Sequence, residues 1–283
     1  MLLLPEEKAA LSLRELYSSF GYKFYRMSRF EEYDFYADKK DFLISKSVLT
    51  FTDINGRLMA LRPDVTLSII RHVKDTDLIS KFFYDEKVYR VPKNAKSFRE
   101  IPQTGIEYIG KLSVDGLSEV IELAMLSLKK IADGRKYILD VADAGMISKL
   151  LEDFRDSHKR SEILKCLSGK NIHGLKSLNA PEKLIRLAEL GGNIDKDINE
   201  LDGSLTVSVL KNLKNYHNEM RIDFSAVSNL NYYNGIVFRG FIQGIPESIL
   251  SGGQYDNMMS MMGHKNAGAA GFAVYLGLME RIS

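Results

Sequence analysis

The stretch KFFYDEKVYRVPKNAKSFREIPQTGIEYIG, residues Lys81–Gly110, decides the fold that we expect for the whole chain. Its first part, Phe82–Val91, is rich in Phe, Tyr and Val, which suit the pleated surface of a strand. The following segment, Pro92–Ser97, holds a proline, an asparagine and two lysines, which do not continue a strand ladder easily. A second long strand follows and ends near Gly110. The stretch therefore predicts a hairpin of two long strands.

The second strand of this hairpin carries polar side chains on one face. Because side chains alternate across a sheet with period two, Gln103, Gly105 and Glu107 share one face, and Ile106 and Tyr108 lie on the other. The face with Ile106 is expected to be core. The other face carries an amide, a glycine without a side chain, and a carboxylate. Such a polar row, on a strand inside a large sheet, favours the binding of a polar ligand. The alternative is an edge strand that has one face exposed to solvent.

Composition limits the classes of protein that the chain can belong to. Its 283 residues can form one large domain or two. A net charge of +2 gives no strong field for nucleic acid. The single cysteine, Cys166, excludes a disulfide framework and fits a reducing cytosol. No apolar run is long enough to span a bilayer, and no histidines stand at metal-ligand spacing, so we expect neither a membrane span nor a metal.

Apolar periodicity and turn residues predict the other elements. We expect helices at Glu6–Phe20, around Leu67–Val73, and at Ser118–Asp133, Leu205–Asn218 and Asp256–Met262; and strands at Tyr22–Met27, Leu49–Asp53, Arg57–Leu61, Tyr137–Val141, Arg221–Ala226, Asn231–Gln243 and Ser248–Ser251. Ser251-Gly252-Gly253 is expected to begin a turn. This order predicts an α+β fold, a largely antiparallel sheet flanked by helices. Residues 142–202 are mostly helical in pattern and are interpreted as a small helical insertion, so that 1–141 and 203–283 make up the core domain.

The segment LRPDVT, residues 61–66, combines a helix start with candidate ligand groups. Pro63 holds Arg62 extended. Asp64 or Thr66 then precedes a helical apolar pattern and is a candidate N-cap. A capping role and a ligand contact are compatible, because a helix N-terminus is open to whatever lies before it.

Six motifs occur in an order that marks a known family. They are LRPDVT (61–66), VYRVP (88–92), QTGIEYIG (103–110), LNYYNGIVF (230–238), SGGQYD (251–256) and AGFAVYLGL (270–278). Together they resemble the catalytic domain of class II histidyl-tRNA synthetase. The resemblance is closer still to its paralogues, the regulatory subunits of ATP phosphoribosyltransferase in histidine biosynthesis. It implies a class II synthetase-like fold from about Glu15 onwards.

The resemblance also implies a histidine-binding pocket. The residues at its positions are Asp64, Thr66, Arg90, Gln103, Glu107, Tyr232 and Tyr233. The arginine suits a ligand carboxylate, the aspartate, threonine and glutamine can accept from the ammonium, and the glutamate can bond an imidazole N–H. The two tyrosines supply stacking area. If their segment is a regular strand, however, they point to opposite faces, and one is then a core residue.

Several synthetase positions have changed in this chain. Ser228 stands where the resemblance places a catalytic arginine, and Asn231 stands where it places an aspartate. A second motif-two arginine is missing, and the last-motif arginine aligns near Leu278, three residues before Arg281. Transfer to ATP needs preorganised positive charge, and one such donor is worth roughly 10²–10³ in rate. We therefore expect a site that binds histidine without activating it, with no catalytic residue and no cofactor.

The resulting expectation is a non-catalytic regulatory subunit in the cytoplasm. The resemblance implies a homodimer that assembles with a short-form catalytic subunit into a hetero-octamer, supports its activity and conveys histidine feedback. With no sequence after Ser283 for an anticodon-binding domain, no tRNA is expected as partner. Two alternatives remain: a stand-alone histidine-activating ligase, and a histidine sensor with another partner. A tRNA-related accessory protein is disfavoured.

Overall fold

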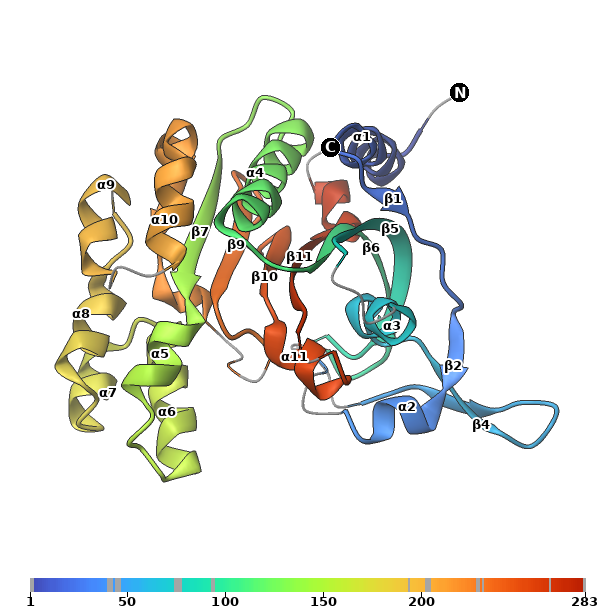
Figure 1. Cartoon of the computed structure of the whole chain (residues 1–283), viewed down its shortest axis with the longest axis horizontal. Coiled ribbons are helices and arrows are strands. Elements are labelled where there is room, and N and C mark those ends of the chain that lie inside the picture. Colours follow the sequence, from blue (N-terminus) through green and yellow to red (C-terminus); the bar gives the residue numbers. More distant parts are fainter. Residues whose placement is uncertain are drawn as a thin grey trace.

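A computed structural model describes residues 3–39, 43, 47–73, 78–92, 95–192, 194–201, 205–227, 230, 232–264 and 266–281. Within them an eight-stranded sheet has the order β1-β5-β6-β11-β10-β9-β7-β8, and a separate three-stranded sheet has the order β2-β4-β3. Figure 1 shows helices on both faces of the large sheet. Strands pair antiparallel throughout the large sheet except at its ends, where β1 runs parallel to β5 and β8 runs parallel to β7. The expected α+β fold with a largely antiparallel sheet is confirmed.

The strands and helices have the following bounds. The strands are β1 Lys23–Phe24, β2 Phe30–Glu32, β3 Thr50–Thr52, β4 Leu58–Leu61, β5 Ser80–Arg90, β6 Arg99–Gly110, β7 Tyr137–Asp143, β8 Met220–Ile222, β9 Ile236–Ile242, β10 Leu250–Gln254 and β11 Gly268–Tyr275. The α-helices are α1 Pro5–Ser19, α2 Tyr33–Ala37, α3 Val65–His72, α4 Val114–Ile131, α5 Ala144–Leu150, α6 Ser157–Ser168, α7 Ile172–Ser177, α8 Glu182–Glu189, α9 Ile194–Asp197, α10 Leu205–Asn212 and α11 Asp256–Met261. Short 3₁₀ helices occupy Ile198–Glu200, Lys214–Glu219, Phe224–Ala226 and Leu276–Arg281.

The long hairpin β5–β6 forms as predicted, and the two faces of β6 differ as predicted. Ile106 and Tyr108 belong to the larger buried apolar cluster, which α1 and α4 cover. Glu107 is buried on the opposite face, between β5 and β11, where it pairs in register with Phe82 and Gly271. The edge-strand alternative is wrong, because β6 has a neighbour on each side.

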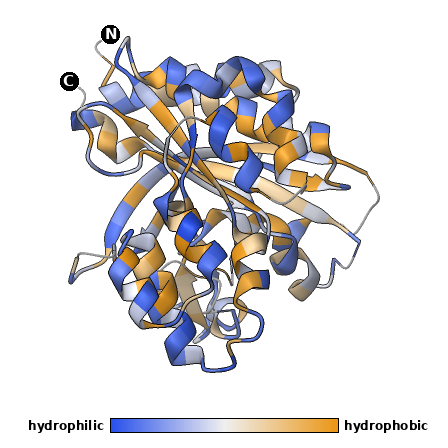
Figure 2. Ribbon diagram, turned by 90° about the vertical axis from the view of Figure 1, so that its left-hand side faces the viewer, coloured by the Kyte–Doolittle hydropathy of each residue, from blue (hydrophilic) through white to orange (hydrophobic). Residues whose placement is uncertain are grey.

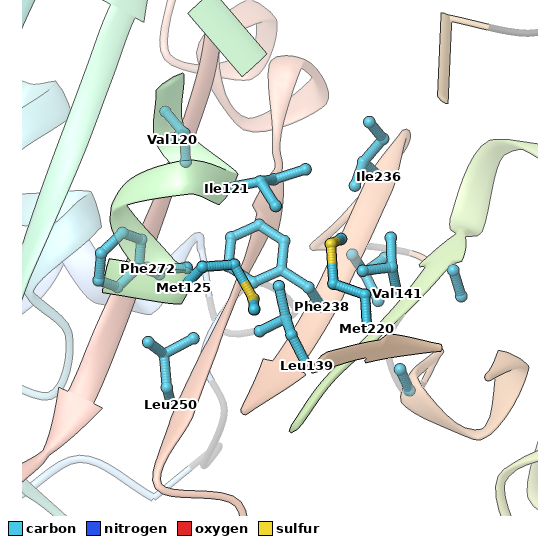
Figure 3. Close-up of a cluster of buried hydrophobic side chains, with 14 of the residues drawn as sticks. Val120, Ile121, Met125, Leu139, Val141, Met220, Ile236, Phe238, Leu250 and Phe272 are labelled. Atoms are coloured by element: carbon cyan, nitrogen blue, oxygen red, sulfur yellow. The ribbon is translucent and has the colours of Figure 1, made fainter. Parts of the chain in front are cut away.

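The main core lies between α4 and the sheet. Figure 3 shows Val120, Ile121 and Met125 of α4 gathered over Leu139 and Phe238 of the sheet. Helices on the outside of such a core need one apolar side. Figure 2 shows this pattern, since the helices alternate between hydrophobic and hydrophilic segments. A second buried cluster, with α3 and α11, covers the other face of the sheet.

The segment interpreted as an insertion forms helices beside the sheet, at the left of Figure 1. Its apolar side chains, among them Ile163, Leu167 and Leu184, join the main core cluster. The strand predicted for Tyr137–Val141 is two residues longer, because Ala142 and Asp143 are the last residues of β7. They pair with Val237 and Ile236 of β9.

Several predicted element boundaries are wrong: the helix predicted for Leu205–Asn218 ends at Asn212, and the strand predicted for Tyr22–Met27 covers only Lys23–Phe24. Gly252 and Gly253 do not begin a turn but pair inside β10. A Cβ at Gly252 would overlap the backbone of β11, and one at Gly253 would overlap the ring of Tyr233, so these glycines serve close packing. The strand predicted from Asn231 starts only at Ile236, and the strand predicted to reach Ala226 ends at Ile222.

Candidate functional site

One pocket on the α3 side of the sheet collects the residues that the sequence singled out. It is lined by Asp64, Val65, Thr66, Tyr84, Arg90, Gln103, Glu107, Tyr232, Tyr233, Ser251, Tyr255, Gly271, Phe272, Ala273 and Tyr275. All seven predicted histidine-binding positions are among them. The side chains leave a cavity of about 40 Å³. A buried water needs roughly 10–15 Å³, so this cavity has room for only a few waters. An amino acid is larger, and it enters only if lining side chains move outward.

Glu107 lines the pocket and is almost completely buried, and both of its carboxylate oxygens already accept hydrogen bonds. The hydroxyl of Thr66 donates to Oε1 at 2.6 Å, and the hydroxyl of Tyr255 donates to Oε2. Gly271 makes room for this carboxylate, since a Cβ at that position would overlap Oε2. Each carboxylate oxygen has a further lone pair, so Glu107 can still accept from a ligand N–H.

Burial controls the charge of Glu107. It raises the pKa of the carboxyl group to about 8, and nearby Asp64 acts in the same direction. The hydrogen bonds from Thr66 and Tyr255 act in the opposite direction. A ligand that brings a positive charge or an N–H donor next to this carboxylate therefore favours its ionised form.

Asp64 combines the two roles that its position predicted. Its side chain caps α3, because the backbone N–H of Leu67 donates to Oδ1 at 3.0 Å. Its carboxyl group also lines the pocket. Burial raises the pKa of Asp64, while the Leu67 N–H and the charge of Arg90 lower it. One carboxylate thus orders the helix start and faces the ligand space.

Arg90 and Gln103 supply polar groups that are free to bind a ligand. Both are more than nine-tenths buried and line the pocket. Neither side chain makes a hydrogen bond or an ion pair with any residue that the structure describes. Their polar atoms are not among the enclosed side-chain atoms that lack a partner, so these atoms open onto the pocket, where a ligand carboxylate or ammonium can bond them.

Tyr232 and Tyr233 both face the pocket. Their ring centroids are 4.6 Å apart, and Tyr232 also packs edge-on against Tyr255 at 6.1 Å. The alternative in which one tyrosine lies in the core assumed a regular strand. The two residues instead precede β9 in irregular structure, where strict alternation does not apply.

Eight pocket residues were not among the predicted positions, and four of these eight carry a hydroxyl group, namely Tyr84, Ser251, Tyr255 and Tyr275. Tyr84 pairs in register with Gly105, and a Cβ at Gly105 would overlap its ring. A bulky residue opposite a glycine in the predicted hairpin was a usable signal. Tyr255 lies inside the quoted SGGQYD motif, but only the fold shows that its hydroxyl reaches Glu107.

The positions where the chain departs from the synthetase pattern are only partly visible. Ser228 and Asn231, expected to be lost catalytic positions, lie outside the described residues. Arg281 is described, and its guanidinium pairs with Glu247 while both side chains are half exposed. It does not line the pocket.

The described residues hold neither a candidate metal site nor a candidate membrane span. No group of three or more His, Cys, Asp or Glu side chains in the described ranges could hold a metal ion. No helix among the same residues is both long and apolar enough to cross a bilayer.

Comparison with known proteins first identifies the class of protein. The sequence profile of histidyl-tRNA synthetase matches residues 4–279. An ATP phosphoribosyltransferase regulatory subunit/histidyl-tRNA synthetase from Bacillus halodurans has a TM-score of 0.82 at 24% identity, covering 99% of this chain and 79% of its own. A chain of the ATP phosphoribosyl transferase complex from Thermotoga maritima has a TM-score of 0.74 at 18% identity, covering 96% and 97%. The fold is that of a histidyl-type class II synthetase domain.

Sequence relatives then narrow the assignment. The ATP phosphoribosyltransferase regulatory subunit of Thermoanaerobacter pseudethanolicus is 32% identical, over 96% of this chain and 78% of that protein. That of Oceanobacillus iheyensis is 29% identical, over 92% and 70%. The chain belongs to the histidyl-tRNA synthetase family and, within it, to the ATP phosphoribosyltransferase regulatory subunits.

Proposed function

We propose that this chain is a non-catalytic regulatory subunit that binds histidine in the pocket around Glu107. It binds the catalytic subunit of ATP phosphoribosyltransferase, supports its activity and conveys feedback by histidine. It works as a homodimer within a hetero-octamer, without tRNA. Its relatives, which are ATP phosphoribosyltransferase regulatory subunits, support the role and the partner.

The observation that carries the ligand assignment is the distribution of charge in the pocket. A buried acceptor, Glu107, lines the pocket, and two buried side chains without hydrogen-bond partners, Arg90 and Gln103, line the same space. Free histidine has a matching set of groups: an imidazole N–H, an ammonium and a carboxylate. The guanidinium fork fits the carboxylate, and the glutamate fits the imidazole.

The absence of catalysis is supported by the changed cationic positions. Ser228 replaces an arginine in the sequence pattern. Arg281, the cation nearest in sequence to the last-motif position, is engaged with Glu247 away from the pocket. A pocket that holds an amino acid but lacks groups for a triphosphate can bias an assembly between two states through differential affinity.

The function is tested by mixing the purified chain with a short-form catalytic subunit. We expect the two proteins to co-elute from a sizing column and the mixture to turn over ATP and phosphoribosyl pyrophosphate faster than the catalytic subunit alone. Histidine should lower that rate. If the chain neither co-elutes nor raises turnover, the regulatory role is wrong.

The ligand is tested by calorimetry on the pocket. Glu107→Ala should weaken histidine binding by about 1–3 kcal/mol, since the variant removes an acceptor for the imidazole. His173→Ala, far along the chain on α7, is a matched control that should leave the affinity unchanged. Equal affinities of wild type and Glu107→Ala would remove Glu107 from the site.

A further inference from the structure

Glu31 is a buried carboxylate that lies outside the histidine pocket. It stands on β2, only 6% of its surface is exposed, and it does not line the pocket. Its Oε2 accepts hydrogen bonds from the hydroxyls of Tyr36 and Ser68, which are both fully buried. No cation pairs with it within the described part of the chain. Burying a carboxylate without a cation is costly, so the role of Glu31 lies in what it holds in place.

The hydroxyl of Ser68 connects this carboxylate to the start of α3. Its Oγ lies 2.8 Å from Oε2 of Glu31 and 3.0 Å from the backbone carbonyl oxygen of Asp64, the cap residue of the helix. A serine hydroxyl has a single hydrogen, so these two acceptors compete for it. Because a carboxylate is a stronger acceptor than a carbonyl group, Glu31 draws the hydrogen away from the helix backbone.

The first turn of α3 carries two groups of the histidine pocket. The carboxylate of Asp64 caps the helix through the Leu67 N–H and lines the pocket, and the hydroxyl of Thr66 donates to Glu107. A serine hydroxyl that bonds the carbonyl four residues before it bends a helix at that turn. The acceptor that Ser68 uses therefore decides where the carboxylate and the hydroxyl of this turn lie in the pocket.

We propose that Glu31 is a positioning residue for the histidine site. By holding the Ser68 hydroxyl, it keeps the first turn of α3 from bending, so that Asp64 and Thr66 stay placed for the ligand. It does not itself touch the ligand. This inference rests on the proposed function, because the pocket must bind histidine, and it adds a residue outside the pocket that sets the affinity.

Calorimetry with histidine on the whole chain tests this role. Glu31→Met keeps the side-chain length and removes the acceptor, so the Ser68 hydroxyl turns to the carbonyl of Asp64. We expect the variant to bind histidine about three- to tenfold more weakly than the wild type. Ser68→Ala leaves that carbonyl with its helix bond alone and should bind within about twofold of the wild type.

The double variant separates positioning from a purely structural role. Glu31→Met combined with Ser68→Ala should recover the affinity of Ser68→Ala alone, because no hydroxyl is left to bend the helix. If Glu31 only stabilises the fold, the second lost contact adds to the first and no recovery occurs. Tyr36→Phe is the matched control: it removes the other hydrogen bond to the same oxygen of Glu31, leaves the Ser68 contact in place, and should keep the wild-type affinity.

Glu31→Gln is a second variant in case the methionine variant unfolds, which melting temperatures would reveal. It keeps a weaker acceptor, so it should show a smaller loss of affinity that Ser68→Ala again reverses. The positioning role is refuted if the folded Glu31 variants bind histidine as the wild type does, or if Ser68→Ala fails to restore their affinity. A wild type that binds no histidine would instead overturn the proposed function, and this role with it.

Discussion

Glu107 shows how one buried side chain can couple ligand binding to pH. Its pKa is about 8 in the folded chain, against 4.5 for the ordinary group. Between these values the folded protein holds a proton that the unfolded chain has released. The free energy of unfolding should therefore fall as pH rises through this window and become level above it.

Glu107→Gln should remove that slope. We expect the wild type to lose stability on the order of a few kcal/mol between about pH 5 and pH 8.5, relative to the glutamine variant. Urea unfolding at several pH values measures this difference. Parallel curves for the two proteins would show that Glu107 ionises normally in the fold.

Asp64 allows a capping role to be separated from a ligand role. Asparagine caps a helix as well as aspartate does, so Asp64→Asn should keep the free energy of unfolding, while Asp64→Ala should lose about 1 kcal/mol. Both variants remove the negative charge and should weaken histidine binding. Thermal unfolding and calorimetry measure the two effects. If the asparagine variant binds histidine as the wild type does, the charge of Asp64 does not serve the ligand.

At the scale of elements, the pocket depends on how closely β6 and β11 approach. Gly271 lies opposite Glu107, and a Cβ there would overlap both the carboxylate and the backbone carbonyl of Ile106. Gly271→Ala should therefore destabilise the fold by about 1–3 kcal/mol and displace Glu107, which also weakens histidine binding.

Gly277→Ala is the matched control for this prediction. A Cβ at Gly277 would meet its nearest neighbour, the ring of Pro102, at 3.8 Å, an ordinary contact. It should change the free energy of unfolding by no more than about 0.5 kcal/mol. Equal melting temperatures for the two alanine variants would mean that β6 and β11 can separate without cost.

At the scale of the whole molecule, the chain should not activate histidine even when one cation is restored. Ser228→Arg should still show no histidine-dependent exchange of pyrophosphate with ATP, because the other cationic groups are missing from the sequence pattern and Arg281 is paired with Glu247. Calorimetry with histidine would verify that the variant is folded. Measurable exchange would favour the stand-alone ligase.

The sequence by itself determined the hairpin and the polar face of its second strand. It also limited the cap of α3 to Asp64 or Thr66, and it determined the family. Strand alternation and capping chemistry are local, so spacing along the chain is enough to predict them. The six motifs in their order likewise identify the family, and this does not require knowing which residues are in contact. This is why the seven pocket positions could be listed before the structure was known.

Only the tertiary structure decided which side chains meet in space. Tyr255 reaches Glu107 from 148 positions along the chain. Ser251, in a segment predicted to turn, remains in a strand because other chain segments pack against the glycines that follow it. Tyr232 and Tyr233 share the pocket because their backbone leaves strand geometry just before β9. Such contacts depend on sheet order and burial, which involve distant segments at once, and no local pattern encodes them.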